Sequence, residues 1–501
     1  MKNCFLFSLL ICSSNVFSQN NAGIGTTTPD SSAQLEVYSK TQGFLPPRMT
    51  YEERSQIHSP AAGLIIWCTN CGAKGELEVF NGTNWTNTTG SSSSASPNII
   101  FIIADDMGWD VFGSYPGITS TKATTPTIDS LARNGITFTN AWVNPFCTPT
   151  RAALLTGKYP FRTGVGGINP QASLQSTETI IQKYITDNTT NSYANAVIGK
   201  WHVSPTNQLT APEGFGAQFY AGFFGGEVAD YYNWTQISGG TQQNITTYTT
   251  TQFVNQSISW IQQQSKPFFL WLAFNAPHIP FHRPPLNLIT DQTLSNSAAA
   301  ISANQGLYYR TAIEAMDREV ARLISSLSTA QRENTVFVFL GDNGTPVQVA
   351  QSPYNGNRAK GTLFQGGINT PMVVSGKNVT RKNVVETAMV QAQDIFPTFA
   401  DIAGASSSNY QDGVSIKPLF TDANAPKRTY QYSEQFGNNP STNDGYAIRN
   451  TNYKLIHLNT GTEYFYKVST DPFEGTNLLL TTLSAEAQTN LDQLRQIKAG
   501  L

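Results

Sequence analysis

The chain has 501 residues, a formal net charge of -2 at pH 7 and 13% charged residues. This length allows one large α/β domain plus a small module, and 39% hydrophobic residues are enough for a buried core. The near-neutral balance excludes a broad basic surface of the kind that binds nucleic acid. An anionic substrate must therefore be recognised by a few local cations.

Residues 1–18 are similar to a secretory signal peptide. A lysine precedes the apolar stretch 5–11, and small side chains occupy the two positions that signal peptidase reads. We predict a mature start at Gln19 and export to the periplasm, the cell surface or the medium. A lipoprotein cleaved before Cys12 is the alternative, which the bulky residue preceding that cysteine disfavours. Nothing later in the sequence is apolar for long enough to span a bilayer, so we do not expect a transmembrane protein.

Three cysteines remain after removal of this signal: Cys68, Cys71 and Cys147. Cys68 and Cys71 form a Cys-x-x-Cys pair without the second pair that would complete a zinc site. They are therefore either a local disulfide or two idle thiols. Cys147 is left without an obvious partner, which is unusual in an exported chain and requires a chemical explanation.

A small module is predicted over residues 19–89, followed by a serine-rich linker, 90–97, that has nothing to bury. Within the module, Thr50-Tyr51-Glu52-Glu53 is a capping box that opens a short helix. Residues 63–67 and 77–80 are predicted strands, and an Asn-Gly turn follows the second.

Two segments of this module, 23–30 (GIGTTTPD) and 43–50 (GFLPPRMT), resemble an N-terminal surface module that recurs in secreted proteins of Bacteroidetes-type bacteria. The resemblance implies cell-surface attachment or oligomerisation, not chemistry. A passive spacer is the alternative.

After the linker, short apolar runs alternate with helical segments, a pattern typical of an α/β domain with a mainly parallel sheet. We predict a large domain over 98–428 and a smaller C-terminal subdomain over 429–501. The predicted strands of the large domain are 98–104, 194–198, 267–274 and 335–340, and its helices include 127–134, 307–327 and 394–403. The subdomain has candidate strands at 429–433, 446–449, 454–458 and 463–466, then a helix at 485–498. In open α/β sheets, ligands bind beyond the carboxyl ends of the strands.

Acidic and amide side chains follow two of the predicted strands. Asp105 and Asp106 follow the first, and Asp342 and Asn343 follow the fourth. Either pair alone is typical of a turn. Together at one edge of a sheet, they supply oxygen ligands suited to Ca²⁺ or Mg²⁺.

Cationic side chains follow the other two strands. The candidates for anion contact or proton transfer are Lys200, His202, His278, His282 and Arg283, with Lys360 on a later glycine-rich loop. A single loop histidine or lysine is usually a solvated residue. Two such loops at the same edge of the sheet make acid–base chemistry on an anion plausible.

Cys147 begins the run Cys147-Thr148-Pro149-Thr150-Arg151. Thr148 is predicted to cap a helix that Gly157 ends. This places the cysteine at a helix N-terminus, where backbone N–H groups favour an anion. Two interpretations remain on physical grounds: a reactive or buried thiol, or a nucleophile that attacks an anionic ester beside a metal.

The ordered set of motifs resembles the formylglycine-dependent sulfatases of the alkaline-phosphatase-like superfamily. Cys147-x-Pro149-x-Arg151, with Leu155-Thr156-Gly157-Lys158-Tyr159-Pro160, is similar to the family signature, and the other motifs above match in order over residues 98–501. The resemblance implies an α/β sandwich with a large mixed, mainly parallel sheet between helices and a smaller antiparallel C-terminal subdomain. Thr150 stands where the family commonly has a smaller residue, which bears on the efficiency of maturation.

The resemblance also implies the chemistry. A maturation enzyme oxidises Cys147 to formylglycine (3-oxoalanine), whose aldehyde hydrate is the nucleophile of a sulfatase. The implied Ca²⁺ ligands are Asp105, Asp106, Asp342, Asn343 and the modified Cys147. The other implied roles are Arg151 holding the hydrate, Lys200, Lys360 and His278 contacting the sulfate or leaving oxygen, His202 acting as the base that releases sulfate, and Asp342 assisting the nucleophile.

Export and the N-terminal module favour a sulfated polysaccharide or its oligosaccharides as the substrate. His282 or Arg283 is then a candidate contact for a uronate or a second sulfate, with ordinary loop packing as the alternative. Two other functions remain open: a metal-dependent phosphodiesterase or phosphonate hydrolase of the same superfamily, and a catalytically silent glycan-binding protein.

Overall fold

The structure is a computed structural model, and it describes residues 21–71, 75–88, 96–113, 118, 120–168, 173–189, 193–405, 409–410, 412–437 and 441–501. The predicted signal peptide and most of the predicted linker lie outside these residues. Within the described part of the chain, no helix combines the length and the apolar character needed to cross a membrane.

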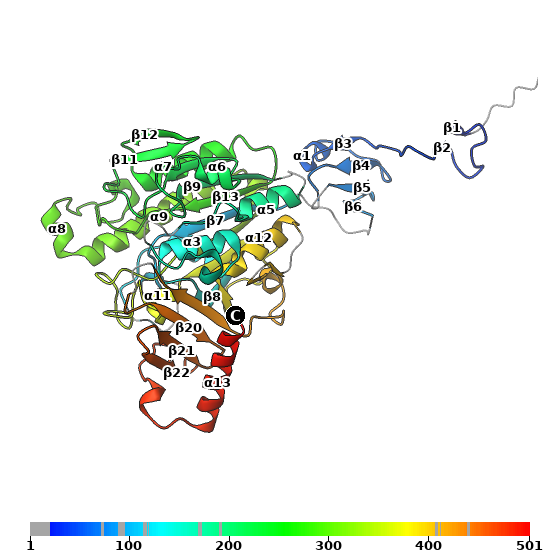
Figure 1. The fold of residues 1–501 in the computed structure, drawn as a ribbon. Coiled ribbons are helices and arrows are strands. Elements are labelled where there is room, and N and C mark those ends of the chain that lie inside the picture. The colour runs from blue at the N-terminus through cyan, green and yellow to red at the C-terminus, as the bar shows by residue number, and fades with distance from the viewer. Residues whose placement is uncertain are drawn as a thin grey trace, which may run out of the picture.

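A large mixed sheet forms the centre of the molecule (Figure 1). Its strands are β7 (Asn98–Ala104), β8 (Gly135–Trp142), β9 (Ala194–Lys200), β10 (Tyr220–Phe223), β11 (Trp234–Ser238), β12 (Thr241–Ile245), β13 (Phe268–Ala273), β14 (Thr335–Gly341), β15 (Met372–Gly376) and β16 (Val384–Gln391). Over the described residues their order is β12-β11-β10-β9-β13-β7-β14-β15-β8-β16. The central strands from β10 to β14 run parallel, and β15 pairs antiparallel with both β14 and β8.

Helices cover both faces of this sheet, which explains the uninterrupted apolar runs of its strands. One face packs on α3 (Cys147–Thr156), α5 (Ile181–Asn188) and α12 (Ile395–Ala403), and the other on α2 (Pro126–Arg133), α7 (Thr249–Ile261) and α9 (Gln305–Ser326). All seven residues of β7 are buried. Phe101 meets Trp271 and Phe399 edge to face in the first core, whereas Ile100 and Ile102 belong to the second.

The C-terminal subdomain is an antiparallel sheet with one long helix, as predicted. Its elements are β19 (Gln431–Gln435), β20 (Gly445–Arg449), β21 (Lys454–Leu458), β22 (Glu463–Tyr466) and α13 (Ala485–Ala499). A buried ion pair within the subdomain, Lys454 with Glu474, also contacts the large domain: Lys454 donates to the Leu363 carbonyl, and Glu474 accepts from the Gln365 N–H. Because these contacts lie a few residues after Lys360, the subdomain supports the loop that carries this candidate site residue.

The N-terminal module contains a small sheet at one side of the large domain (Figure 1). Its elements are β3 (Arg48–Met49), α1 (Tyr51–Arg54), β4 (Ile65–Cys68), β5 (Glu76–Phe80) and β6 (Trp85–Asn87). The capping box of Thr50 and Glu53 is present. Cys68 and Cys71 form a disulfide, which decides between the two alternatives for this pair. The pair β1 (Ala22–Ile24) and β2 (Leu35–Val37) lies at the distal end.

The remaining short elements are α4 (Pro160–Thr163), α6 (Ala211–Phe215), α8 (Ala298–Ala303), α10 (Thr329–Glu333), α11 (Gln365–Ile368), β17 (Asn409–Tyr410) and β18 (Gly413–Val414).

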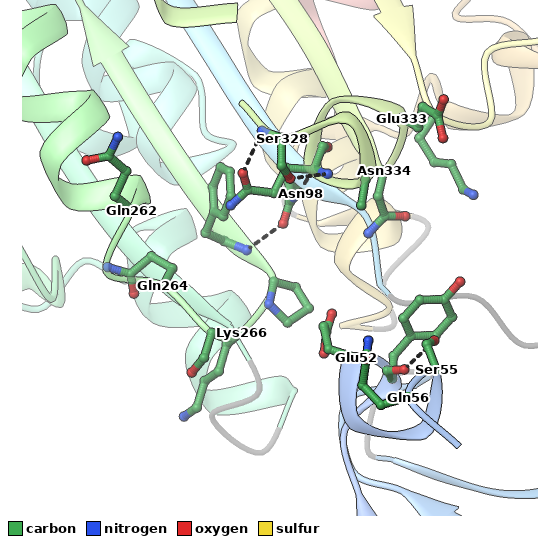
Figure 2. Close-up of a pocket in the computed structure, with 17 residues that line it drawn as sticks. Glu52, Ser55, Gln56, Asn98, Gln262, Gln264, Lys266, Ser328, Glu333 and Asn334 are labelled. Carbon is green, nitrogen blue, oxygen red and sulfur yellow. Dashed lines mark hydrogen bonds between the residues drawn. The ribbon is translucent and has the colours of Figure 1, made fainter. Parts of the chain in front are cut away.

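A polar cleft opens between α1 and the amino ends of the central strands. Figure 2 shows Glu52 and Gln56 of the module facing Asn98, Lys266 and Asn334 of the large domain. Asn98 begins β7, so this cleft lies at the end of the sheet opposite to the strand ends that carry the candidate site residues. It is separate from the site described next.

Candidate active site

The carboxyl ends of four neighbouring strands bring the predicted residues together. In the sheet, β9, β13, β7 and β14 are consecutive neighbours. Lys200 ends β9, Asp105 follows β7, and Asp342 follows β14. Parallel pairing aligns these ends, so side chains distant in sequence converge on one edge of the sheet.

Cys147 is the first residue of α3, and its free thiol is buried. Its Sγ lies 3.3 Å from Nδ1 of His202. Extended backbone at Phe146 caps the helix, so the prediction that Thr148 is the cap was wrong. The Thr148 hydroxyl instead lies 3.2 Å from His202 Nδ1, inside the site. Gly157 ends the helix in the left-handed conformation, as predicted.

Arg151 connects the ends of β9 and β14 through its hydrogen bonds. Its Nε and Nη2 donate to Oδ2 of Asp342 at 3.0 and 2.8 Å, and its Nη1 donates to the Lys200 carbonyl at 2.8 Å. Asp342 also accepts from the Asp106 N–H. Burial lowers the pKa of Arg151, but Asp342 and Asp105 outweigh it and hold the pKa above its ordinary value. The guanidinium therefore positions Asp342 directly.

Replacing Arg151 with methionine is expected to destabilise the protein by about 3–5 kcal/mol, because the buried Asp342 carboxylate loses its partner. Urea unfolding measures this loss. Arg162→Met is the matched control. The Arg162 side chain, which pairs with Asp412, is 43% exposed, so we expect its replacement to lower the free energy of unfolding by less than about 1 kcal/mol. Equal midpoints for the two variants would contradict the buried ion pair.

Asp105 and Asp106 each form an ion pair with a lysine. Lys200 Nζ donates to Asp105 Oδ2 at 2.6 Å, and Lys360 Nζ donates to Asp106 Oδ1 at 2.5 Å. Asn343 Nδ2 also donates to Asp106 Oδ1. Burial raises the pKa of Asp106, but Lys360 and His278 outweigh it and lower the pKa below its ordinary value. The carboxylate is therefore ionised despite being buried.

The donor set fits a hard cation such as Ca²⁺. Among the described residues, Asp105, Asp106 and His278 each offer a ligand atom within 4.8 Å of the others. Two further buried oxygens, Asp105 Oδ1 and Asn343 Oδ1, have no hydrogen-bond partner. Buried carboxylate and amide oxygens that lack a donor are those that a hard cation coordinates.

Two histidines lie near this cluster. His278 Nε2 lies 3.5 Å from Asp106 Oδ2, and its Nδ1 donates to the Ile279 carbonyl at 3.0 Å. Burial, together with Lys200 and Arg151, holds the pKa of His202 well below its ordinary value. His202 is consequently neutral at neutral pH, the form that can accept a proton.

His282 and Arg283 contact protein groups next to the site. The His282 ring stacks on Tyr231 with centroids 3.7 Å apart. Its Nδ1 donates to the Pro280 carbonyl at 2.9 Å, and its Nε2 accepts from the Tyr248 hydroxyl at 2.9 Å. Arg283 donates to the Leu294 carbonyl. These contacts favour loop packing over the substrate role considered from the sequence.

An aspartate that sequence reasoning missed joins the two acidic loops. Asp110 accepts from the Thr345 hydroxyl and from the Gln351 N–H, while Thr345 Oγ1 also accepts from the Gly108 N–H. Tyr309 donates to the Asp106 carbonyl at 2.6 Å. These two partners of the Asp110 carboxylate are more than two hundred residues away in the chain, and no local motif indicates them.

Comparison with known proteins gives three family matches. The model described as "Sulfatase" matches residues 97–405. A model for the C-terminal region of N-sulphoglucosamine sulphohydrolase matches residues 356–499, and one for a phage tail like trimerisation region matches residues 23–98.

Individual relatives cover most of the chain. The uncharacterized sulfatase YdeN of Escherichia coli (strain K12) is 25% identical over 453 residues, covering 73% of this chain and 79% of the relative. An ulvan-active sulfatase of Formosa agariphila is 25% identical over 436 residues, covering 77% of each. The crystal structure of Ps i-CgsB in complex with k-i-k-neocarrahexaose aligns with a TM-score of 0.66 and 26% identity, covering 81% of this chain and 92% of that one.

Proposed function

Because the chain belongs to the sulfatase family and is a sulfuric ester hydrolase, we propose that it is an exported enzyme that removes sulfate from a sulfated polysaccharide or its oligosaccharides. The observation that carries the proposal is the buried Cys147 at a helix N-terminus, with a histidine on one side and an acidic cluster with two lysines on the other. The ulvan-active relative and the carrageenan-oligosaccharide complex support a polysaccharide substrate.

Cys147 is proposed to be the precursor of formylglycine, formed by a maturation enzyme. Burial raises the pKa of its thiol above the ordinary value, although the positive charges of Lys200 and Lys360 act to lower it. A thiol with a raised pKa is a poor nucleophile at neutral pH. The aldehyde that replaces it would supply, when hydrated, a hydroxyl nucleophile for sulfur and a second hydroxyl whose deprotonation releases sulfate.

Ca²⁺ is proposed to bind Asp105, Asp106, Asp342, Asn343 and the residue derived from Cys147. When bound, the ion would supply a fixed positive charge that draws electron density from the sulfate oxygens. The orphaned oxygens of Asp105 and Asn343 support this ligand set.

The chain's own side chains perform the remaining steps. Lys200 and Lys360 provide cations for the sulfate oxygens, in a buried setting that strengthens such contacts. His278, which lies beside Asp106, is assigned to donate a proton to the leaving alcohol oxygen. His202, neutral and 3.3 Å from Cys147 Sγ, is assigned to accept the proton of the second hydroxyl. Asp342, held by Arg151, is assigned to assist the nucleophile.

A sulfate-release screen tests this function. The mature protein is incubated with defined sulfated oligosaccharides and, in parallel, with matched phosphate monoesters and diesters. We expect sulfate release from a subset of the oligosaccharides and much slower hydrolysis of the phosphates. Preferential hydrolysis of phosphate esters would establish the alternative of a phosphodiesterase or phosphonate hydrolase.

The N-terminal module is proposed to assemble three copies of the chain, a role supported by its match to a trimerisation region. Its distal part leaves apolar side chains uncovered: Ile24, Leu35, Phe44 and Leu45 are 59%, 55%, 68% and 68% exposed. The β1–β2 pair has three residues in each strand and no buried residue. Such a pair is at most marginally stable alone, so we expect other copies of the chain to pack on its exposed apolar side chains.

Charging this surface is expected to dissociate the assembly. We predict that the double variant Phe44→Asp, Leu45→Asp is a monomer, because two buried carboxylates would oppose association. Light scattering after gel filtration measures the mass, with the unaltered chain expected at three times the monomer. Leu480→Asp, at an 82% exposed apolar residue of the C-terminal subdomain, should remain a trimer. An unaltered chain that elutes as a monomer would contradict the proposal.

A further inference from the structure

A glycine-rich turn after β10 lies directly over the two proposed catalytic histidines. A Cβ atom on Gly226 would stand 3.0 Å from Cε1 and Nε2 of His202. The next residue, Glu227, places its Oε2 4.0 Å from Nδ1 of His278. The absence of a side chain at position 226 therefore allows this turn to approach one histidine closely while its acid reaches the other.

Glu227 differs from the other acids of the site in its exposure. Its side chain is 56% exposed, whereas those of Asp105 and Asp106 are almost completely buried. Within the described part of the chain, its carboxylate makes no hydrogen bond to another side chain or to the backbone. Its oxygens are therefore available to a molecule that enters the site from solvent.

We propose that Glu227 determines substrate specificity: it accepts hydrogen bonds from carbohydrate hydroxyls next to the scissile sulfate and rejects a second anionic group there. The proposal rests on the sulfatase function proposed above. The Glu227 carboxylate lies 4.0 Å from Nδ1 of His278, the residue assigned to the leaving oxygen, so a sugar whose leaving oxygen contacts His278 would lie near this carboxylate.

The physical basis is the sign of the charge. A hydroxyl donates a charge-assisted hydrogen bond to a carboxylate, whereas a second sulfate or a uronate a few ångströms away is repelled. At a half-exposed position the repulsion is partly screened, and it should change kcat/KM by about tenfold. The proposed preference is for a singly sulfated ring whose neighbouring substituents are neutral.

Matched substrate pairs test this specificity. Monosaccharide 2-, 4- and 6-sulfates are compared with the 2,3-, 3,4- and 4,6-disulfates, respectively, in which the additional sulfate occupies the nearest carbon that bears a hydroxyl. The discrimination ratio is kcat/KM for the monosulfate divided by that for the disulfate. For Glu227→Gln we expect this ratio to fall by about tenfold, because the repulsion is removed. For Glu227→Lys it should fall further, because the charge now attracts the second sulfate.

A control with the same change in net charge separates local from general electrostatics. Glu333→Gln, at the amino-end cleft of Figure 2, should leave the ratio unchanged. If both Glu227 variants release sulfate with the ratio of the unaltered enzyme, the specificity proposal is overturned while the sulfatase function stands. If the unaltered, formylglycine-bearing protein releases no sulfate from any ester, the proposed function fails and this proposal falls with it.

Discussion

Replacing Cys147 with alanine is expected to lower kcat/KM for sulfate release by at least about four orders of magnitude, because the precursor of the nucleophile is lost. The fold should survive. The side chain is buried at the start of α3, and removing one sulfur there should cost only about 1–2 kcal/mol. Sulfate-release kinetics and thermal unfolding on the same preparation separate the two effects.

A second variant identifies the reason for the loss. Cys147→Ser, produced without a maturation enzyme, keeps a hydroxyl but has no second one with which to expel sulfate. We expect at most one sulfate per protein molecule, retained as a serine ester visible by mass spectrometry. Multiple turnovers by either variant would show that another group is the nucleophile.

Removing divalent metal is expected to lower kcat by at least about 10²-fold, because the proposed ion would stabilise charge on the sulfate oxygens. Stability should fall as well. A ligand at a hundredfold excess over its Kd contributes about 2.7 kcal/mol to the folded state, and Asp105, Asp106 and Asp342 are buried carboxylates that the ion would help to neutralise.

Chelation with EGTA and addition of Ca²⁺ or Mg²⁺ provide the measurement, with both kcat and Tm recorded. Ca²⁺ should restore both. Asn343→Leu removes the orphaned amide oxygen and should weaken the Ca²⁺-dependent rise in Tm. A chelated protein that keeps the Tm and the activity of the untreated one would contradict the metal assignment.

Sequence patterns predicted much of the fold because the decisive strands are buried on both faces. Such strands are continuous apolar runs with clear ends, and residues 98–104 were predicted with the bounds that the structure has. The partly buried strands 454–458 and 463–466 of the C-terminal subdomain were also predicted with their observed bounds. The strand ends then indicated which acidic and basic residues would meet. The structure brings Asp105, Asp106, Lys200 and Asp342 together at one edge of the sheet.

Other features depend on tertiary contacts that no local pattern carries. The start of α3 was misplaced because the Thr148 hydroxyl is engaged by His202, leaving the cap to the extended Phe146. The contact of Asp110 with Thr345 joins loops 235 residues apart. The role proposed for Glu227 is equally invisible in the sequence, because it rests on the distance of this residue from His278.

The chemical state of residue 147 is the direct test of the proposed nucleophile. The full chain, coproduced with a formylglycine-generating enzyme, is digested, and the peptide that contains Thr148 to Arg151 is analysed by mass spectrometry. The proposed mechanism predicts an aldehyde in place of the Cys147 thiol, in a fraction that follows the specific activity of each preparation. A fully active preparation in which this peptide carries only unmodified cysteine would contradict it.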